Sequence, residues 1–169
     1  GNTVSNLSSS RALRDVTHKH GGTYTASAVG EVNVVIKMKE TNTVIGGEGN
    51  GGIIYPASHY GRDSLVGVAL FLSHMAHEKI SCKALRDSYP SYFMSKNKIQ
   101  LTPQINVDHI LEMMANKYSG EEVNTIDGVK IDFEHQWVHL RKSNTEPIIR
   151  IYTESTSQQS AYELAERFI

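Results

Sequence analysis

The chain has 169 residues, of which 39% are hydrophobic and 21% charged, and its formal net charge is −1 at pH 7. These values describe an ordinary soluble globular protein with one large domain or two small ones. The nearly neutral charge argues against nucleic acid and acidic membranes as partners, because both select basic surfaces. No apolar run reaches the ~18 residues that a bilayer-spanning helix requires.

Cysteine and histidine usage bounds the location and the metal chemistry. The single cysteine, Cys82, excludes an internal disulfide and is typical of a reducing cytoplasm. The eight histidines include the close pairs His18/His20 and His74/His77, but no third ligand follows at a suitable spacing. Because closed metal sites need three or four converging ligands, we predict no metal site in this chain.

Strands and helices alternate in the first half of the chain. Ser8-Ser9-Ser10 offers an N-cap for a first helix, Gly21-Gly22 offers its C-cap, and Asp63 opens a long apolar helix. The predicted strands cover residues 4–7, 23–26, 43–46 and 52–55, and the helices run from the serines to residue 20, over 31–40 and over 63–78. This alternation indicates an α/β fold, which we expect to be a three-layer domain with a mixed sheet.

The composition changes after about Ser81, where a short helix is broken before Pro90. We therefore predict domains at residues 1–86 and 96–169, joined by a linker at 87–95. In the second domain, strands are predicted at 98–101, 122–126, 129–134, 137–140 and 148–154, and helices at 107–118 and 158–168. Asp127-Gly128 predicts a type I′ hairpin turn, because both residue types accept positive φ. Helices on one face of an antiparallel sheet would make this a small α+β domain.

A polar loop lies between the last two predicted strands. It reads Arg141-Lys142-Ser143-Asn144-Thr145-Glu146-Pro147. An arginine fork matches a phosphate bidentately, and hydroxyl, carboxamide and backbone N–H donors complete such a site. The loop therefore predicts phosphate binding, although a bland loop could contain these residues by chance.

A second loop, Gly46-Gly47-Glu48-Gly49-Asn50-Gly51-Gly52, separates two short apolar runs. Its glycines allow positive φ and close approach of the backbone to a ligand. Glu48 can accept hydrogen bonds from hydroxyls, and Asn50 can both donate and accept. This set suits the vicinal hydroxyls of a sugar, whereas the glycines alone would favour a plain hairpin turn.

Together the two loops resemble the C-terminal half of the α-D-phosphohexomutases, the superfamily of phosphoglucomutase, phosphomannomutase and phosphoglucosamine mutase. The glycine-rich loop is similar to the sugar-specificity loop of their third domain, and the polar loop to the phosphate-binding loop of their fourth. Tyr60-Gly61-Arg62-Asp63 and Ile126-Asp127-Gly128-Val129 also lie where relatives carry similar motifs. The resemblance spans essentially the whole chain and implies a TATA-binding-protein-like fold for the second domain.

The resemblance implies reversible phosphoryl transfer between O1 and O6 of a hexose, through a hexose 1,6-bisphosphate that serves as intermediate and activator. Family members carry their phosphoserine and Mg²⁺-binding aspartates on the first two domains, and this chain has neither motif. We therefore interpret it as a C-terminal fragment without catalytic residues, starting part-way into the third domain. Its expected partners are a phosphorylated hexose and the missing N-terminal domains, and Mg²⁺ would bind outside it.

Three further residues are candidates. Glu31 lies where phosphomannomutase-like relatives carry a sugar-contacting histidine. An acid there could accept from a sugar hydroxyl, pair with a substrate ammonium, or simply favour a helix N-terminus. Arg11 lies where some relatives carry an active-site lysine. Arg150 could add charge to the phosphate site or pair with Glu134 or Glu154.

The sugar loop departs from its more common form, which has Ser and His where this chain has Asn50 and Gly52. That departure favours the archaeal type of phosphoglucosamine mutase, and the alternatives are phosphomannomutase/phosphoglucomutase or a non-catalytic phosphosugar-binding module. The predicted sugar-binding residues are Glu48, Asn50, Glu31 and Arg11. The predicted phosphate-binding residues are Arg141, Ser143, Asn144, Thr145 and Arg150.

Overall fold

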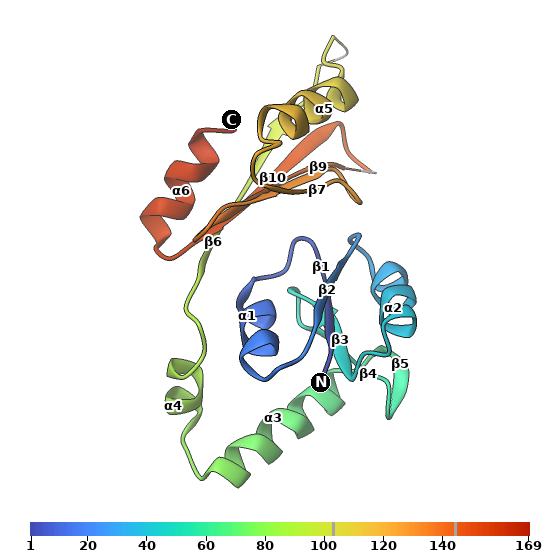
Figure 1. The fold of residues 1–169 in the computed structure, drawn as a ribbon, viewed down its shortest axis with the longest axis vertical. Coiled ribbons are helices and arrows are strands. Elements are labelled where there is room, and N and C mark those ends of the chain that lie inside the picture. Colours follow the sequence, from blue (N-terminus) through green and yellow to red (C-terminus); the bar gives the residue numbers. More distant parts are fainter. Residues whose placement is uncertain (103, 144) are drawn as a thin grey trace. The chain divides into compact units, whose positions relative to one another are not determined.

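The computed structural model describes residues 1–102, 104–143 and 145–169. The chain forms two compact units, Gly1–Ser91 and Tyr92–Ile169, and each has its own five-stranded sheet (Figure 1). No helix among the described residues is long and apolar enough to cross a membrane.

Unit 1 is built on a mixed sheet with the strand order β2-β1-β3-β4-β5. The first three strands of that order are parallel, and β4 and β5 extend the sheet with antiparallel pairings. The strands are β1 (Thr3–Asn6), β2 (Tyr24–Ser27), β3 (Ile45–Glu48), β4 (Gly52–Tyr55) and β5 (His59–Arg62). The helices are α1 (Ala12–Lys19), α2 (Glu31–Glu40), α3 (Ser64–Glu78) and α4 (Cys82–Asp87).

The glycine pair after α1 ends that helix as expected. Gly21 has a φ of +69°, which a residue with a side chain rarely adopts. The backbone N–H groups of Gly21 and Gly22 donate to the carbonyls of His18 and Thr17 over 3.0 and 2.9 Å. This is the double hydrogen bond of a Schellman motif, which satisfies carbonyls left open at a helix end.

The two faces of this sheet are covered differently. α2 packs on one face, where Val4, Val34, Met38 and Ile54 form a fully buried cluster. α3 contacts the opposite face, because a Cβ at its Gly67 would lie 3.0 Å from the side chain of Ile53, the strand neighbour of Ile54.

α3 is an apolar helix without a single buried residue. Its start is well defined, since the Asp63 carboxylate accepts from the Val66 N–H over 3.0 Å, and this hydrogen bond lowers the pKa of Asp63. Leu65, Val68 and Leu72 nevertheless expose 80%, 54% and 54% of their surface. A contiguous apolar helix surface of this kind favours association.

Unit 2 contains an antiparallel sheet with the strand order β6-β10-β9-β8-β7. The strands are β6 (Phe93–Gln100), β7 (Glu122–Asn124), β8 (Val129–Asp132), β9 (Trp137–Lys142) and β10 (Ile148–Ser155). The helices α5 (Val107–Lys117) and α6 (Gln158–Glu166) cover one face.

Alternation along the strands separates the two faces of the unit 2 sheet. Residues such as Val138, Leu140, Ile149 and Ile151 pack with α5 and α6 in one core. The opposite face of β9 and β10 carries polar and aromatic residues, paired in register as Arg141–Arg150, His139–Tyr152 and Trp137–Glu154.

The predicted fold class is confirmed: a mixed-sheet α/β unit precedes an antiparallel α+β unit. Two strands differ from the prediction. β5 was not expected, because its exposed residues show no apolar alternation and it joins β4 across a register shift. β6 begins at Phe93, within the segment predicted as a linker, because all eight of its residues pair with β10. The division into functional domains at 1–86 and 96–169 stays a prediction.

Of two local predictions, the turn is wrong and the helix cap is confirmed. Asp127-Gly128 does not form a type I′ turn, since only Gly128 has positive φ (+73°) and the strand pairing between Asn124 and Lys130 leaves a longer loop. The serine run caps α1 as predicted: the Ala12 N–H donates to Ser10 Oγ over 3.2 Å, and Arg11 between them has helical backbone angles and makes no side-chain cap hydrogen bond.

Candidate functional site

The predicted sugar-binding residues of unit 1 lie near the carboxyl ends of its parallel strands. Glu48 ends β3, and Glu31 opens α2 after the loop that follows β2. The order β2-β1-β3 sends successive connections to opposite sides of β1, so this edge is a topological switch point. Open α/β sheets bind ligands at such points, where loops and helix N-termini converge.

Glu48 is held through one of its two carboxylate oxygens. Asn6 Nδ2 donates to Glu48 Oε1 over 2.7 Å, and the Gly30 backbone N–H donates to the same oxygen over 3.1 Å. Gly30 is the N-cap residue of α2, so the carboxylate lies at the positive end of that helix. No described residue donates to Oε2, which leaves this oxygen for a ligand hydroxyl.

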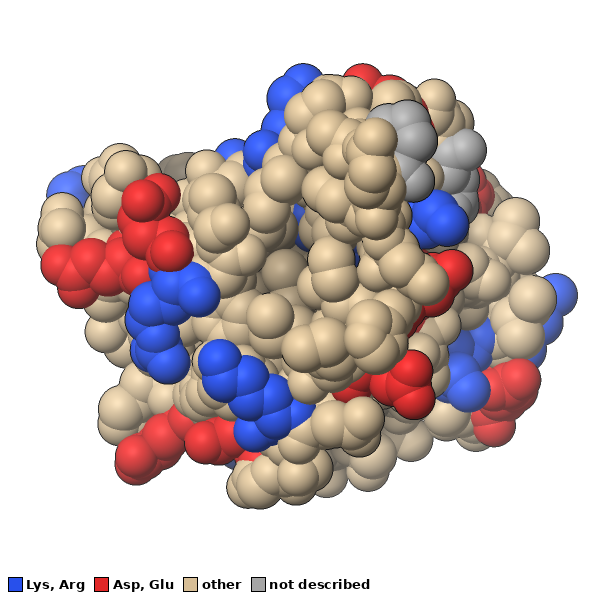
Figure 2. All heavy atoms as spheres, turned by 90° about the horizontal axis from the view of Figure 1, so that it is seen from above, with Lys and Arg blue, Asp and Glu red and all other residues tan. Residues whose placement is uncertain are grey.

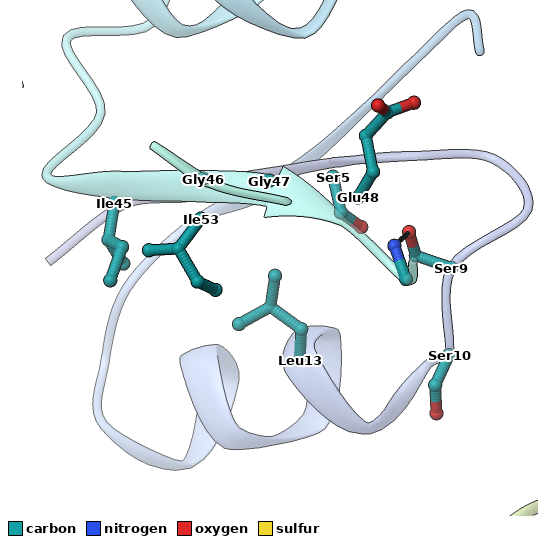
Figure 3. Close-up of a pocket in the computed structure, with 10 residues that line it drawn as sticks. Ser5, Ser9, Ser10, Leu13, Ile45, Gly46, Gly47, Glu48 and Ile53 are labelled. Atoms are coloured by element: carbon teal, nitrogen blue, oxygen red, sulfur yellow. Dashed lines mark hydrogen bonds between the residues drawn. The ribbon is translucent and has the colours of Figure 1, made fainter. Parts of the chain in front are cut away.

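A loop after β1 supports the glycine-rich loop. Asn6 Oδ1 accepts from the Ser8 N–H and from the Ser9 hydroxyl, over 3.1 and 2.9 Å. Ser9 Oγ in turn accepts from the Gly49 N–H over 2.8 Å (Figure 3). The sequence analysis did not predict these roles for Asn6 and Ser9, because their partners are 42 and 40 positions away. Only the run of three serines marked the segment.

Asn50 closes the tip of the β3–β4 hairpin. Its Oδ1 accepts from the Gly52 N–H over 3.2 Å, which leaves the carboxamide NH₂ group as an exposed donor. Between them, Gly51 has a φ of +93°, so the turn depends on a glycine there. Asn50 thus combines a structural contact with a donor that a sugar hydroxyl could use.

Glu31 and Asn50 come together around a cavity of 380 Å³, which Arg62 also lines. The Arg62 backbone N–H donates to Glu31 Oε1 over 3.1 Å, and Arg62 Nε donates to Oε2 over 2.9 Å. Arg62 was not predicted as a site residue, although the motif that contains it was noticed. Because this ion pair is solvent-exposed, it is worth only about 0–1 kcal/mol and could exchange with a ligand.

Two other features of unit 1 are an apolar cavity, which Glu48 and Gly49 also line, and the buried side chain of Arg11. A cavity of 220 Å³ beside Leu13, Ile45 and Ile53 is lined mainly by apolar groups, and the Glu48 carboxylate points away from it (Figure 3). Arg11 is only 4% exposed, so its guanidinium has little access to a ligand in this conformation. Its sugar-binding role stays a prediction.

The predicted phosphate loop of unit 2 connects β9 to β10. It is closed by the Ser143 N–H, which donates to the Ile148 carbonyl over 3.0 Å, and by Ser143 Oγ, which accepts weakly from the Thr145 N–H at 3.4 Å. Arg141 precedes this turn on β9. Asn144 lies outside the described residues, so its predicted contact stays a prediction.

Two guanidinium groups border this loop on one face of the sheet. Arg141 and Arg150 are direct cross-strand partners, so their side chains project to the same side. Arg141 Nε lies 2.9 Å from Asp127 Oδ2, and Arg150 Nη2 lies 2.9 Å from Glu146 Oε2. Two arginines beside a turn with a hydroxyl-bearing side chain are groups of the kind that bind a doubly charged anion, and phosphate binding here stays a prediction.

The partner of Arg150 differs from the alternatives considered in the sequence. Among the described residues it pairs with Glu146, four positions earlier, and not with Glu134 or Glu154. Glu154 Oε1 instead accepts from Trp137 Nε1 over 2.7 Å. The strand register explains this, because it places Glu154 opposite Trp137.

The described residues do not offer a magnesium site. They contain no group of three or more His, Cys, Asp or Glu side chains that could hold a metal ion. Two carboxylates at the candidate sites are engaged by arginines, in the pairs Glu31–Arg62 and Asp127–Arg141, and Glu48 alone cannot supply the ligands of a metal ion. Mg²⁺ needs free oxygen ligands in near-octahedral geometry, so these side chains do not fit it.

The face of the structure shown in Figure 2 has no continuous basic area among its described residues. The described basic and acidic side chains on this face are interspersed among uncharged ones. Nucleic-acid sites require a continuous basic area to neutralise phosphates.

Comparison with known proteins places these two sites in a family context. Residues 1–92 match the family model "phosphoglucomutase/phosphomannomutase, alpha/beta/alpha domain III" and residues 97–169 match that of the C-terminal domain. A phosphoglucosamine/phosphogalactosamine mutase of Sulfurisphaera tokodaii is 37% identical over 163 residues, covering 95% of this chain and 36% of that protein. A phosphoglucomutase/phosphomannomutase of Thermococcus kodakarensis is 34% identical over 168 residues, covering 98% of this chain and 36% of that protein.

Solved structures that resemble this chain come from the same family as its sequence relatives. A phosphoglucomutase/phosphomannomutase family protein of Burkholderia thailandensis superposes with a TM-score of 0.80 at 25% identity, covering 99% of this chain and 36% of that one. An N-acetylphosphoglucosamine mutase of Aspergillus fumigatus, solved with GlcNAc-6P and magnesium, shares the fold at a TM-score of 0.66 and 13% identity, covering 98% of this chain and 37% of that one. The chain spans little more than a third of the length of these relatives, and it belongs to the phosphoglucomutase/phosphomannomutase family as its third and C-terminal domains.

Proposed function

We propose that this chain is the substrate-recognition part of a phosphohexomutase, which interconverts a hexose 6-phosphate and the corresponding 1-phosphate through a 1,6-bisphosphate. The observation that carries the proposal is the pair of arginines, Arg141 and Arg150, aligned across two strands beside the Ser143 turn. The carboxylate of Glu48 at the switch point of unit 1 supplies the second half of the recognition.

In this proposal unit 2 anchors the phosphate that does not react. Arginine forks bind phosphate oxygens with directional, charge-assisted hydrogen bonds, and the loop adds hydroxyl and backbone donors. Phosphoryl transfer depends mainly on positioning and charge neutralisation, so anchoring the distal phosphate aligns the reacting one. Arg141, Ser143, Asn144, Thr145 and Arg150 are the residues we assign to this role.

Unit 1 would recognise the sugar ring. Glu48 Oε2 can accept from a ring hydroxyl and the Asn50 NH₂ group can donate to another. The cavity beside Glu31 adds a carboxylate that could exchange Arg62 for a substrate ammonium. An acidic group there favours an amino sugar, so we propose phosphoglucosamine as the substrate, with glucose and mannose phosphates as alternatives.

The remaining chemistry is proposed to lie outside this chain. A phosphoserine and a Mg²⁺ ion would be supplied by domains outside this chain, and closure around the substrate would exclude water from the reacting phosphate. The purified chain should therefore show no mutase activity with glucosamine 6-phosphate or glucose 1-phosphate and a bisphosphate activator. Turnover above background would contradict this division of roles.

Titration of the ¹⁵N-labelled chain tests the recognition itself. Inorganic phosphate should shift the amides of residues 141–146, with affinity on the order of millimolar because a small exposed anion offers few contacts. Glucosamine 6-phosphate should also shift residues 30–31 and 48–52, and Arg141→Ala should abolish the first set. Shifts centred elsewhere, or equal shifts with unphosphorylated glucosamine in unit 2, would refute the proposal. Phosphate binding without any response in unit 1 would favour a phosphate-binding module.

A further inference from the structure

Asp127 lies beside the phosphate loop without belonging to it. Its Oδ2 and Oδ1 atoms lie 2.9 and 3.1 Å from Arg141 Nε, and both side chains are largely withdrawn from solvent, with exposures of 23% and 19%. A carboxylate beside a phosphate-binding arginine should weaken anion binding by competing for the guanidinium. Its position therefore needs a separate physical reason.

The loop that carries Asp127 is fixed from two sides. His139 Nε2 lies 2.7 Å from the Asp127 carbonyl oxygen, which can only accept, so the imidazole must carry its proton on Nε2. At Gly128, a Cβ would lie 2.2 Å from the Leu140 carbonyl oxygen, so the loop is pressed directly onto β9. Asp127 is thus held against the strand that bears Arg141.

His139 makes this anchor independent of pH in the neutral range. It is 1% exposed, and burial lowers its pKa to about 4. The imidazole therefore stays neutral near pH 7 and keeps its donated hydrogen bond without adding positive charge to the site.

The contact geometry distinguishes the two arginines of the site. Asp127 engages only Nε of Arg141, and no described residue accepts from its two Nη groups. Glu146 instead engages Nη2 of Arg150, an end nitrogen that a phosphate would also need. The two Nη groups of Arg141 are therefore available to an anion, whereas Arg150 must break its ion pair with Glu146 before its Nη2 group can bind one.

We propose that Asp127 is a positioning residue of the phosphate site, which orients the Arg141 guanidinium from its Nε side so that both Nη groups face the anion. The inference rests on the proposed phosphate-binding role of this loop. Orientation before binding removes part of the entropy cost of immobilising a long side chain.

The test separates orientation from simple charge competition by measuring phosphate affinity in about 0.5 M NaCl, where the screening length is only about 4 Å. Asp127→Ala should raise the dissociation constant of inorganic phosphate by about 2- to 12-fold, the usual cost of ordering one flexible side chain. Asp127→Asn keeps a carbonyl acceptor and should stay within about 3-fold of wild type. Glu122→Ala is the matched control, since it removes an exposed carboxylate from β7 of the same sheet.

A second readout needs no ligand. Exchange of the Arg141 Nε proton with water, followed by NMR, should be slow in wild type, at least about tenfold faster in Asp127→Ala, and unchanged in Glu122→Ala. Equal or tighter phosphate binding by Asp127→Ala at high salt would show that Asp127 only competes with the anion and would overturn the inference. So would unchanged Nε exchange. If wild type binds no phosphate, the proposed function fails, while the exchange measurement still decides whether Asp127 orients Arg141.

Discussion

Acidification should destabilise unit 2 through His139. The ordinary pKa of this group is 6.5, and burial lowers it to about 4 in the folded chain, against the opposing effect of its hydrogen bond to Asp127. Lys130 and Arg141 lower the pKa further, and the Asp127 carboxylate raises it. The unfolded chain therefore takes up a proton as the pH falls below 6.5, while the folded chain does not until about pH 4.

The difference between the two pKa values of His139 sets the sign and the size of the change in stability. The stability associated with neutral His139 is complete above pH 6.5 and is lost progressively down to about pH 4. Because each pH unit between the two values is worth about 1.4 kcal/mol, the total loss is about 3 kcal/mol, a large part of the stability of a small domain.

Trp137 makes the measurement specific to unit 2, because it is the only tryptophan and is fully buried there. Urea unfolding followed by its fluorescence should be compared for wild type and His139→Gln between pH 7 and pH 4. Glutamine cannot ionise and keeps an N–H donor for the Asp127 carbonyl, so other titrating groups cancel in the difference. The advantage of wild type should shrink by about 3 kcal/mol on acidification. A difference that does not vary with pH would refute the assignment of a buried neutral imidazole.

Three further outcomes are expected. Glu48→Gln in the full-length enzyme should lower kcat/KM roughly 10- to 150-fold in both directions, since a hydrogen bond to a charged group is worth about 1.5–3 kcal/mol; wild-type values in steady-state assays would make the loop a structural turn. Gly51→Val should cost about 1–3 kcal/mol in thermal unfolding, because a Cβ there meets no neighbour and only the positive φ opposes it. Gly51→Asn should cost less, and equal costs would contradict the backbone explanation. The exposed apolar surface of α3 should make the isolated chain self-associate, and Leu65→Lys with Leu72→Lys should lower the association seen by sedimentation velocity; unchanged association would place the contact elsewhere.

The correctly predicted features are those that depend on residues close together in the sequence. Gly21 and Asp63 mark helix ends through their own backbone and side-chain hydrogen bonds, and both were identified. The two candidate loops were singled out because unusual residue types are concentrated within a few positions, and their binding roles stay predictions. The family resemblance and the fold class are confirmed.

The features that were not predicted depend on contacts between residues far apart in the sequence. Asn6 reaches Glu48 only because β1 and β3 are neighbours in the sheet, and no short motif records a separation of 42 residues. The Asp127-Gly128 pair was assigned the wrong turn because the wider loop is held by β9, through contacts with His139 and Leu140. Arg150 pairs with Glu146, which is close in sequence but lies outside the predicted strand, so the strand pattern did not indicate it as a partner.

The cross-strand alignment of Arg141 and Arg150 has a thermodynamic consequence. Like charges directly opposite each other destabilise a sheet, and in unit 2 the carboxylates of Asp127 and Glu146, each 2.9 Å from one guanidinium group, partly offset this repulsion. An anion bound between the two groups relieves it and also binds only the folded state. Phosphate at about ten times its dissociation constant should therefore stabilise unit 2 by about 1.4 kcal/mol through ligand linkage. If the proposed phosphate site is correct, the abundance of the folded protein in a cell would follow the concentration of the phosphate esters that bind there.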